Sequence, residues 1–321
     1  MVVSGPPSET PEGGRSSAFV RATGVRFAYG NGDPVLKGVD LEIGAGEIVG
    51  IAGPRGSGKS TLLRMLAGDL APDAGTLELP PRRSAGGRTM LGYAADEDAH
   101  FEELSGFENA LFFARAGGLR RGEAEASVRE HFAALGLADQ AGRPVRRYSI
   151  ESRRRLLLVE ALVYHPALIL LDSPFNGLDA DTVDALVHVL RLRSARRSTV
   201  VVACNDLGLL PELADRLVFL HEGRVVRSGR VAELLASVGP KTRIEIELEK
   251  RPHGGEVRFR PEIAVVDAGD PFVVETTRGQ VAVGEACAAL TAAGAVIRSV
   301  AVRDPDLAEV FRQAAGAPLD A

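Results

Sequence analysis

The pattern of apolar and polar positions divides the chain into segments of different predicted structure. From Ala18 onward, "FVRATGVRFAYG" and "VLKGVDLEI" alternate apolar and polar residues, which predicts strands with one exposed face. "GEIVGIAG", "ALILLD" and "STVVVAC" are short apolar runs of the kind that parallel sheets bury on both faces. Residues 107–164 carry helical periodicity instead. The pattern therefore predicts an α/β core with a helical insertion at about 107–164.

The two ends of the chain differ from this core in composition and in the pattern of predicted strands and helices. Residues 1–17 are rich in Pro, Gly, Ser and Glu, which is typical of a disordered tail. "RLVFLHEGRVVRSG" predicts a hairpin around Glu222 and Gly223. After "VGPKT", short strands ("RIEIELEK", "EVRFR", "FVVETTRG") precede helices near 283–293 and 305–314. We therefore expect one large domain over 18–238 and a C-terminal accessory or regulatory domain over 239–321.

Composition narrows the function classes. With 321 residues, 45% of them hydrophobic, the chain can bury the cores of a large and a smaller domain. The net charge of −5 argues against general nucleic-acid binding. Cys204 and Cys287 are far apart, which excludes a disulfide framework and favours a reducing compartment. No apolar stretch reaches the roughly 18–20 residues of a membrane span, and the N-terminus lacks an apolar signal core. We therefore expect a cytoplasmic protein.

A glycine-rich segment with one lysine follows the first buried strand. "GPRGSGKST" fits the pattern G-x-x-x-x-G-K-[ST] and precedes a predicted helix. Its glycines let the backbone turn tightly and aim N–H groups inward, while the helix N-terminus adds positive potential. We expect Lys59 to contact the β and γ phosphates of a nucleotide and Ser60 to bind Mg²⁺. The predicted nucleotide-binding residues here are Gly53, Pro54, Arg55, Gly56, Ser57, Gly58, Lys59, Ser60 and Thr61.

A second buried strand completes the predicted magnesium site. "LILLD" ends in Asp172, whose carboxylate is expected to hold Mg²⁺ directly or through water. The "GLD" at residues 177–179 lends this assignment independent support. Ser60 and Asp172 are therefore the predicted metal-binding residues.

Beyond these motifs, residues 18–238 resemble the nucleotide-binding subunit of ABC transporters. The resemblance includes "VLKGVDLEI", "LAPDAGTLEL", "RRRLLLVEALVYHPALILLD", "NGLDADT" and "LADRLVFLHEGRVVRSG". It implies that Tyr29 stacks on adenine, although a tyrosine packed on its own hairpin is an equal alternative. It also implies head-to-tail dimers, with each ATP held between the glycine-rich loop of one subunit and the signature segment of the other. A transmembrane permease is the implied membrane partner.

The C-terminal segment "AVIRSVAVRDPDLAEVFRQAAG" resembles the end of drug-exporter ATPases, the branch that includes daunorubicin-resistance subunits. In that branch a strand leads into a helix of the form P-S-L-E-D-V-F. The matching residues are Pro305, Leu307, Glu309, Val310 and Phe311. The alternative is an ordinary amphipathic helix after a strand.

Three positions depart from the family in ways that touch hydrolysis. Ser173 stands where the family has the catalytic glutamate that polarises the attacking water. A hydroxyl does not accept that proton at neutral pH, and loss of a positioned base costs on the order of 10² to 10⁴ in rate. Asn205 replaces the histidine that contacts the γ-phosphate, and Asp96 replaces a glutamine that reaches the metal and the water. A one-residue shift in alignment would put Glu97 in place of Asp96.

The signature L-S-G-G-Q aligns with "YSIES", Tyr148–Ser152. Ser149 is retained and is expected to cap its helix or touch the opposite γ-phosphate. Ile150 and Glu151 replace both glycines, so a branched side chain and a carboxylate stand where backbone has to approach a polyanion. Like charges about 4 Å apart cost a few kcal/mol at an effective dielectric near 20. The ATP-bound dimer is therefore expected to be weakened on this face.

Together these features predict an α/β protein: a P-loop NTPase (ABC ATPase) core with an antiparallel β subdomain and a helical insertion, plus a small C-terminal α+β domain. The expected function is an ATP-binding subunit of an exporter-type ABC transporter, which binds ATP and Mg²⁺ with weak or absent hydrolysis. Its expected partners are a transmembrane permease subunit and a second ATP-binding subunit, in a homodimer or heterodimer. The chain would then lie on the inner face of the cell membrane through the permease.

A nucleotide-sensing regulatory module of a membrane complex, which transports nothing itself, is the alternative function. In either case "EDAHFEELSGF" is the candidate surface for the membrane partner. Its apolar residues Phe101, Leu104 and Phe107 either face a helix of the permease or pack the helical insertion.

Overall fold

The structure is a computed structural model that describes residues 18–95, 100–238, 242–252, 257, 259–277, 281–303 and 306–316. The predicted tail at 1–17, Asp96 with its alternative Glu97, and Pro305 lie outside the described residues. The described chain forms two compact units, one holding residues up to Ile48 and Thr61–Val201, the other Val49–Ser60 and residues from Val202 on. β3, α1 and β7 each run across the boundary between the two units.

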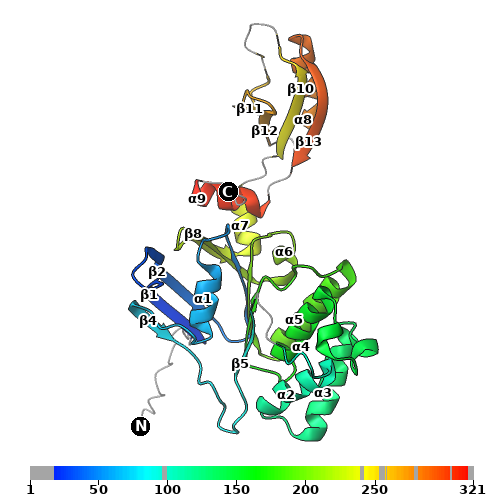
Figure 1. Cartoon of the computed structure of the whole chain (residues 1–321). Coiled ribbons are helices and arrows are strands. Elements are labelled where there is room, and N and C mark those ends of the chain that lie inside the picture. The colour runs from blue at the N-terminus through cyan, green and yellow to red at the C-terminus, as the bar shows by residue number, and fades with distance from the viewer. Residues whose placement is uncertain are drawn as a thin grey trace, which may run out of the picture. The chain divides into compact units, whose positions relative to one another are not determined.

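An antiparallel three-stranded sheet opens the first unit, with the strand order β2-β1-β4 (Figure 1). In the register of β1 and β2, Val20 lies opposite Ile43 and Phe27 lies opposite Leu36. These side chains are buried while their neighbours are partly or fully exposed, so the predicted half-exposed strands are confirmed. The strands are β1 (Val20–Ala28), β2 (Pro34–Ile43) and β4 (Ala74–Glu78).

Two parallel strands of the first unit bring two chain segments to one sheet edge. β5 (Leu91–Ala94) pairs with β6 (Leu168–Asp172), and Ala94 lies opposite Leu171. All of β6 and all of β7 (Thr199–Cys204) are buried, as the apolar runs predict. Because parallel strands end at the same edge, Ala95 and Asp172 lie on that edge together.

Among the described residues between β5 and β6, all the named elements are helices, as the helical periodicity predicts. α2 begins at a capping box, in which the Ser105 hydroxyl accepts the Glu108 N–H and the Glu108 carboxylate accepts the Ser105 N–H. α2, α3 and α4 pack on one another around buried Ala110, Val128 and Leu156 (Figure 1). The first unit's helices after α1 are α2 (Gly106–Ala116), α3 (Arg121–Ala134), η1 (Ala138–Gln140), η2 (Val145–Arg147), α4 (Ile150–Leu162) and α5 (Ala180–Ala195).

The second unit begins with a parallel pair followed by a hairpin. β3 pairs in parallel with β8, and β8 pairs antiparallel with β9. Glu222 and Gly223 join these last two strands with φ of 47° and 76°, the backbone that a tight hairpin requires, so the predicted hairpin is confirmed. The elements are β3 (Ile48–Ala52), α1 (Lys59–Leu66), α6 (Leu210–Leu213), β8 (Arg216–His221), β9 (Arg224–Arg230) and α7 (Val231–Ser237).

An antiparallel sheet of order β11-β12-β10-β13 follows, also in the second unit. Ile244, Ile246 and Val274 line its core against the small residues Ala282 and Ala286 of α8. The strands and helices predicted here by pattern are confirmed, except at "EVRFR", where residues 257, 259 and 260 form no strand. The elements are β10 (Thr242–Lys250), β11 (Ile263–Asp267), β12 (Phe272–Thr276), α8 (Val281–Ala292), β13 (Val296–Arg303) and α9 (Leu307–Ala315).

α9 packs back onto the β8–β9 hairpin of the same unit. The ring of Phe311 lies edge-on to Phe219, with centroids 5.6 Å apart, and against His221. Leu307, Val310 and Phe311 are buried, so this helix is amphipathic with its apolar side inward. Within the described ranges, no helix has both the length and the apolar character of a membrane span.

Candidate functional site

In the loop between β3 and α1, the space around Gly53 admits only glycine. A Cβ atom on Gly53 would lie 2.0 Å from the carbonyl oxygen of Leu220 and 2.8 Å from the Ser57 hydroxyl. Gly56 and Gly58 have φ of 77° and 102°, in the left-handed region that side chains disfavour. The glycines of the motif therefore shape a tight turn that leads directly into the helix N-terminus.

Lys59 lies across this loop. Its Nζ donates to the carbonyl oxygens of Gly53 at 2.7 Å and Pro54 at 2.8 Å, and to the Ser57 hydroxyl at 3.3 Å. The Gly223 N–H donates to the Ser57 carbonyl, which fixes the loop from the hairpin side. A buried ammonium within a ring of loop backbone is the arrangement that suits a polyphosphate, and the exposed Ser60 hydroxyl lies in the first turn of α1.

The end of β7 lies within electrostatic reach of Lys59. Burial raises the pKa of the Cys204 thiol, and the charge of Lys59 acts on the same thiol in the opposite direction. Asn205 is the next residue after the end of β7. Asp206 accepts the Gly208 N–H at 2.7 Å, so its carboxylate closes a turn of its own chain.

Tyr29 is attached to α1 through its hydroxyl. The phenol oxygen lies 3.2 Å from the Thr61 hydroxyl and accepts a longer bond from Arg64 at 3.4 Å. The ring meets Phe27 edge-on at 4.9 Å between centroids, yet the residue stays 46% exposed. Tyr29 thus packs against its own strand and still presents ring surface to solvent; its stacking on adenine stays a prediction.

Asp172 and Ser173 occupy the buried end of β6. The Ser173 hydroxyl points back to Asp172 Oδ1, 3.4 Å away, and Ser173 has a φ of 48°. The Arg154 guanidinium donates to the carbonyl oxygens of Asp172 at 2.6 Å, Ser173 at 2.7 Å and Ala95 at 2.9 Å. Burial, followed by the charge of Asp172, raises the pKa of Tyr93 to about 12. A buried carboxylate is therefore present at this strand end, and the residue after it carries a hydroxyl; binding of Mg²⁺ by Asp172 stays a prediction.

The donor chemistry of Ser60 and Asp172 fits Mg²⁺, which prefers oxygen ligands and is usually bound through one or two carboxylates and substrate phosphates. Ser60 belongs to the second unit and Asp172 to the first. Groups of three or more metal-binding side chains do not occur in the part of the chain that the structure describes. The fit to magnesium therefore depends on a phosphate ligand to supply the remaining oxygens.

The signature segment forms the start of α4. Ser149 caps the helix by accepting the Ser152 N–H at 3.0 Å. Ile150 is 89% exposed. Glu151 pairs with Arg155, which also binds the carboxylate of Asp179 at 2.8 Å. The helix end that the resemblance assigns to a phosphate therefore carries an exposed apolar side chain and a carboxylate.

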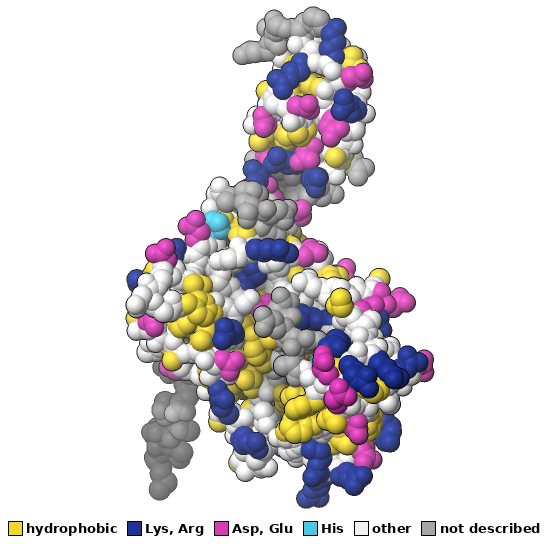
Figure 2. Space-filling view, in the orientation of Figure 1, with side chains coloured by type: hydrophobic (Ala, Val, Ile, Leu, Met, Phe, Trp, Pro, Cys, Tyr) yellow, Lys and Arg dark blue, Asp and Glu magenta, His cyan; other side chains and the backbone are white. Residues whose placement is uncertain are grey.

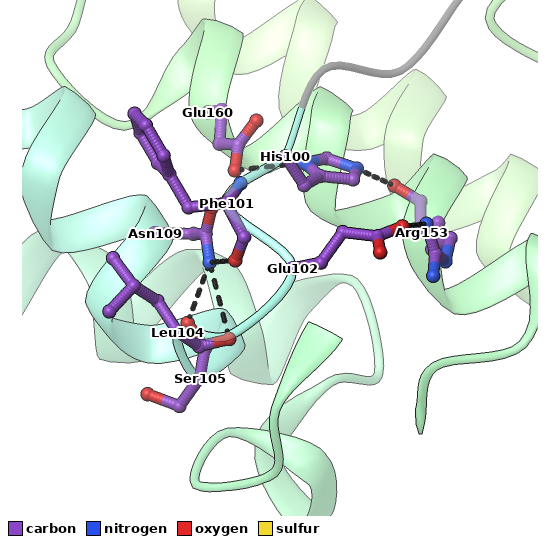
Figure 3. Close-up of polar contacts among 8 residues, drawn as sticks. All are labelled: His100, Phe101, Glu102, Leu104, Ser105, Asn109, Arg153 and Glu160. Carbon is purple, nitrogen blue, oxygen red and sulfur yellow. Dashed lines mark hydrogen bonds and ion pairs between the residues drawn. The ribbon is translucent and has the colours of Figure 1, made fainter. Parts of the chain in front are cut away.

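The segment 100–105, which we call the docking segment, precedes α2 (Figure 3). Phe101 is 46% exposed and Leu104 is 39% exposed, whereas Phe107 packs against Phe132 at 6.2 Å between centroids. Phe107 therefore packs within the helical insertion, while contact of Phe101 and Leu104 with a permease helix stays a prediction. Phe112 of α2, which sequence patterning did not single out, is 51% exposed and meets Phe101 edge-on at 5.1 Å. Hydrophobic side chains gather over α2 in the space-filling view (Figure 2).

Asn109 holds the docking segment in shape, and sequence reasoning assigned it no role. Its side-chain oxygen accepts the Phe101 N–H at 2.9 Å, and its Nδ2 donates to the carbonyl oxygens of Phe101 and Ser105 at 3.0 Å (Figure 3). Asn109 is fully buried, so these bonds replace water around the turn. The only sequence clue is its place four residues after the N-cap Ser105.

The glycine-rich loop between a buried strand and a helix, with a strand-end aspartate, defines a nucleotide-binding protein of the P-loop class. The family profile described as ABC transporter matches residues 36–176. A daunorubicin resistance ATP-binding protein of Streptomyces coeruleorubidus is 32% identical over 92% of this chain and 96% of its own. The chain belongs to the ABC transporter family, and it is an ATP-binding subunit of that family with drug-exporter-like relatives.

Two further comparisons extend this result. A fluoroquinolones export ATP-binding protein of Mycobacterium tuberculosis is 32% identical over 74% of this chain and 78% of its own. A solved dimeric ATP-binding cassette in a post-hydrolysis state, bound to ADP and Pi, is 26% identical, covers 66% of this chain and 98% of its own, and has a TM-score of 0.58. The predicted P-loop NTPase fold of the ABC ATPase type is confirmed.

Proposed function

We propose that this chain is the nucleotide-binding subunit of an exporter-type ABC transporter that binds Mg-ATP and hydrolyses it weakly or not at all. The observation that carries the proposal is the combination of a complete glycine-rich loop around Lys59 with a serine, Ser173, after the strand-end aspartate. The export direction rests on the similarity to drug-resistance and drug-export subunits.

Nucleotide binding is assigned to residues that remain intact. The backbone N–H groups of 55–60 and the Lys59 ammonium would hold the phosphates, and Ser60 and Asp172 would hold Mg²⁺. Tyr29, already fixed to Thr61 through its hydroxyl, offers its ring to adenine. Mg²⁺ bound there would neutralise phosphate charge, which the Asp172 carboxylate and the Ser60 hydroxyl cannot do by themselves.

Weak hydrolysis is expected from the side chains at three positions, Ser173, Asn205 and Asp206. The Ser173 hydroxyl donates to Asp172 and has no basic character at neutral pH. Asn205 bears no charge, and the neighbouring Asp206 carboxylate is engaged by the Gly208 N–H. None of these three side chains supplies the base that activates water, so slow turnover is the expected outcome.

Assembly with a second ATP-binding subunit is proposed to be weak on the signature face. The exposed Ile150 and the carboxylate of Glu151 would meet the phosphates bound by the partner subunit. Bringing a carboxylate near a polyanion is unfavourable. A heterodimer or a homodimer meets the same obstacle wherever this chain supplies the signature segment.

The permease is proposed to bind an apolar patch made of Phe101, Leu104 and Phe112. The three side chains are exposed, and two of them contact each other edge-on. A short amphipathic helix of a transmembrane subunit is the occupant that suits such a patch on a transporter ATPase. Through this contact the chain would lie on the inner face of the cell membrane.

A nucleotide-sensing module that moves nothing is the second candidate function. It is favoured by one observation: Ile150 and Glu151 obstruct the signature face while the glycine-rich loop is intact. In this case ATP would set the conformation of a membrane partner without substrate movement.

The decisive experiment isolates the chain with its native membrane partner and measures ATP affinity and turnover on the same sample. We expect ATP to bind in the presence of Mg²⁺, turnover to be far below that of transporter ATPases with a catalytic glutamate, and Lys59→Ala to abolish binding. Turnover at rates usual for the family, lost in Lys59→Ala, would overturn weak hydrolysis. Substrate flux in reconstituted vesicles separates transport from sensing.

A further inference from the structure

His100 stands at the start of the docking segment and is enclosed by α4. Its side chain is fully buried. Nδ1 lies 3.2 Å from a carboxylate oxygen of Glu160, and Nε2 lies 3.1 Å from the carbonyl oxygen of Arg153 (Figure 3). Both partners, Glu160 and Arg153, belong to α4.

The partners of the two ring nitrogens define the form of the imidazole. A carbonyl oxygen only accepts, and an ionised carboxylate only accepts, so both nitrogens have to donate. With Glu160 ionised, the doubly protonated imidazolium satisfies both contacts and places a positive charge beside this buried carboxylate. The charge of Glu160 also contributes, after burial, to a Tyr164 pKa raised to about 12.

Other contacts attach the docking segment to α4 and to the residues that precede α4. Arg153 donates to Glu102 at 2.8 Å. The backbone N–H of Arg146 donates to the Glu102 carbonyl, and that of Val145 donates to the Leu104 carbonyl. Glu102 is more than half exposed, so its ion pair is screened, and the buried His100 pair is the stronger attachment.

α4 also reaches the strand end that carries Asp172. Successive residues on a helix point about 100° apart, so Arg153 and its neighbour Arg154 leave α4 in different directions. Arg153 reaches the docking segment, while Arg154 binds the carbonyl oxygens of Asp172 and Ser173. One rigid helix therefore connects the docking segment to the end of β6 within the first unit.

We propose that His100 is a positioning residue: as an imidazolium held by Glu160 and Arg153, it fixes the docking segment to α4, the helix that also binds the Asp172–Ser173 strand end. This inference rests on the proposed function, because it presumes a membrane partner at Phe101, Leu104 and Phe112. The inference adds one residue pair, His100 and Glu160, that sets how firmly the docking segment is held.

The first test uses the isolated full-length chain. Nitrogen-15 NMR of the histidine rings at neutral pH is expected to show both His100 nitrogens protonated. In His100→Gln, hydrogen exchange at the amides of 101–104 is expected to quicken by about tenfold or more, the effect of losing a hydrogen bond to a charged group. His188→Gln, the same change at an exposed histidine of α5, is expected to leave those amides unchanged. A neutral His100 ring, or unchanged exchange in His100→Gln, overturns the inference.

The second test measures binding to the native membrane partner in detergent. His100→Gln and Glu160→Gln are each expected to weaken binding by about tenfold, and the double variant no more than either alone, because the two residues act as one pair. Mg-ATP affinity is expected to stay at the parental value in all three, which shows that they are folded.

The outcomes of the second test separate the inference from the proposed function. If the parental chain binds neither ATP nor the partner, the proposed function fails. If the parental chain binds both and His100→Gln binds the partner equally well, the inference alone fails. Strictly additive losses in the double variant also contradict the pair.

Discussion

Gly53 is the residue of the glycine-rich loop that tolerates least change. A Cβ there would meet the Leu220 carbonyl at 2.0 Å, and backbone atoms do not move aside as a flexible side chain does. We expect Gly53→Ala to lower the free energy of unfolding by about 1–3 kcal/mol and to weaken Mg-ATP binding. Urea unfolding and nucleotide titration measure the two effects.

Gly56→Ala is the matched control for this change. Gly56 has a positive φ, of 77°, whereas Gly53 does not, and a Cβ at Gly56 has no atom within 4 Å. The control therefore carries backbone strain without the steric clash, and its expected loss of stability is smaller. Equal losses in both variants would show that the approach to Leu220 costs no more than the left-handed backbone at Gly56.

A single change at Ser173 is not expected to restore hydrolysis. Ser173→Glu adds the missing carboxylate, but Asn205 and the signature segment of Ile150 and Glu151 stay altered. Steady-state ATP turnover of this variant is expected to remain well below that of family members with complete motifs. Full turnover from this one substitution would mean that the other departures are harmless.

The difference between local and distant contacts explains which site residues were predictable. The glycine-rich loop and Asp172 were placed by spacing, because their roles depend on a few consecutive residues beside a strand. Arg154 was not, because its partners are main-chain carbonyls of segments that only the fold brings close. Asn109 was not, because it bonds main-chain groups of the turn just before its helix. Backbone carbonyls carry no sequence signature, so these contacts are invisible in one sequence.

At the scale of elements, a buried contact joins α3 to α5. The Arg193 guanidinium, which only donates, lies 2.7 Å from His131 Nε2, and His131 Nδ1 lies 2.7 Å from the Ser127 carbonyl oxygen. The ring is therefore neutral, with its proton on Nδ1. Burial lowers the pKa of His131, opposed in part by its bond to Ser127. Partial burial, then the charges of Arg193 and His131, lowers the pKa of His165 to about 4.

This contact predicts that acid destabilises the fold. The unfolded chain binds protons at these histidines near pH 6.5, while the folded chain does not until lower pH, so the unfolded state gains protons first. The free energy of unfolding is expected to fall as the pH drops from about 6.5 towards 4. Glu130 opposes the shift of both rings, and Arg196 adds to that of His165. His165 is exposed, so solvent screens its contribution to the pH dependence of stability. His131 is therefore expected to contribute more.

His131→Gln tests this origin of the pH dependence. Glutamine keeps a donor and an acceptor but does not titrate, so the fall in stability between pH 6.5 and 4 is expected to become shallower. Chemical unfolding across this range measures it, with His188→Gln on the exposed side of α5 as the control. The same slope in parent and His131→Gln would assign the pH dependence to other groups.

Elements with a regular pattern were predictable, and those without one were not. The β8–β9 hairpin was predicted from Glu222-Gly223 between two apolar runs, since that turn chemistry is local. β11 was missed because only Ile263 of its five residues is buried, so it shows no alternation. Its place in the sheet comes from pairing with β12, which is a long-range property.

At the scale of the whole molecule, the signature face is expected to limit assembly. Replacing both Ile150 and Glu151 by glycine removes the exposed branched side chain and the carboxylate, while Arg155 retains its contact with Asp179. We expect this double variant to dimerise in Mg-ATP with a dissociation constant at least about tenfold lower than that of the parent, since 1.4 kcal/mol corresponds to tenfold. Light scattering at several protein concentrations, with and without Mg-ATP, gives the constant.

The control for this prediction is the same double change combined with Lys59→Ala, which removes the ammonium charge that is proposed to hold the phosphates. If ATP drives the association, the triple variant stays monomeric at the concentrations where the double variant is dimeric. Dimers that form equally well without nucleotide would indicate a new apolar or backbone contact instead. A double variant that remains as weak as the parent would show that the obstacle to the ATP-bound dimer lies outside the signature segment.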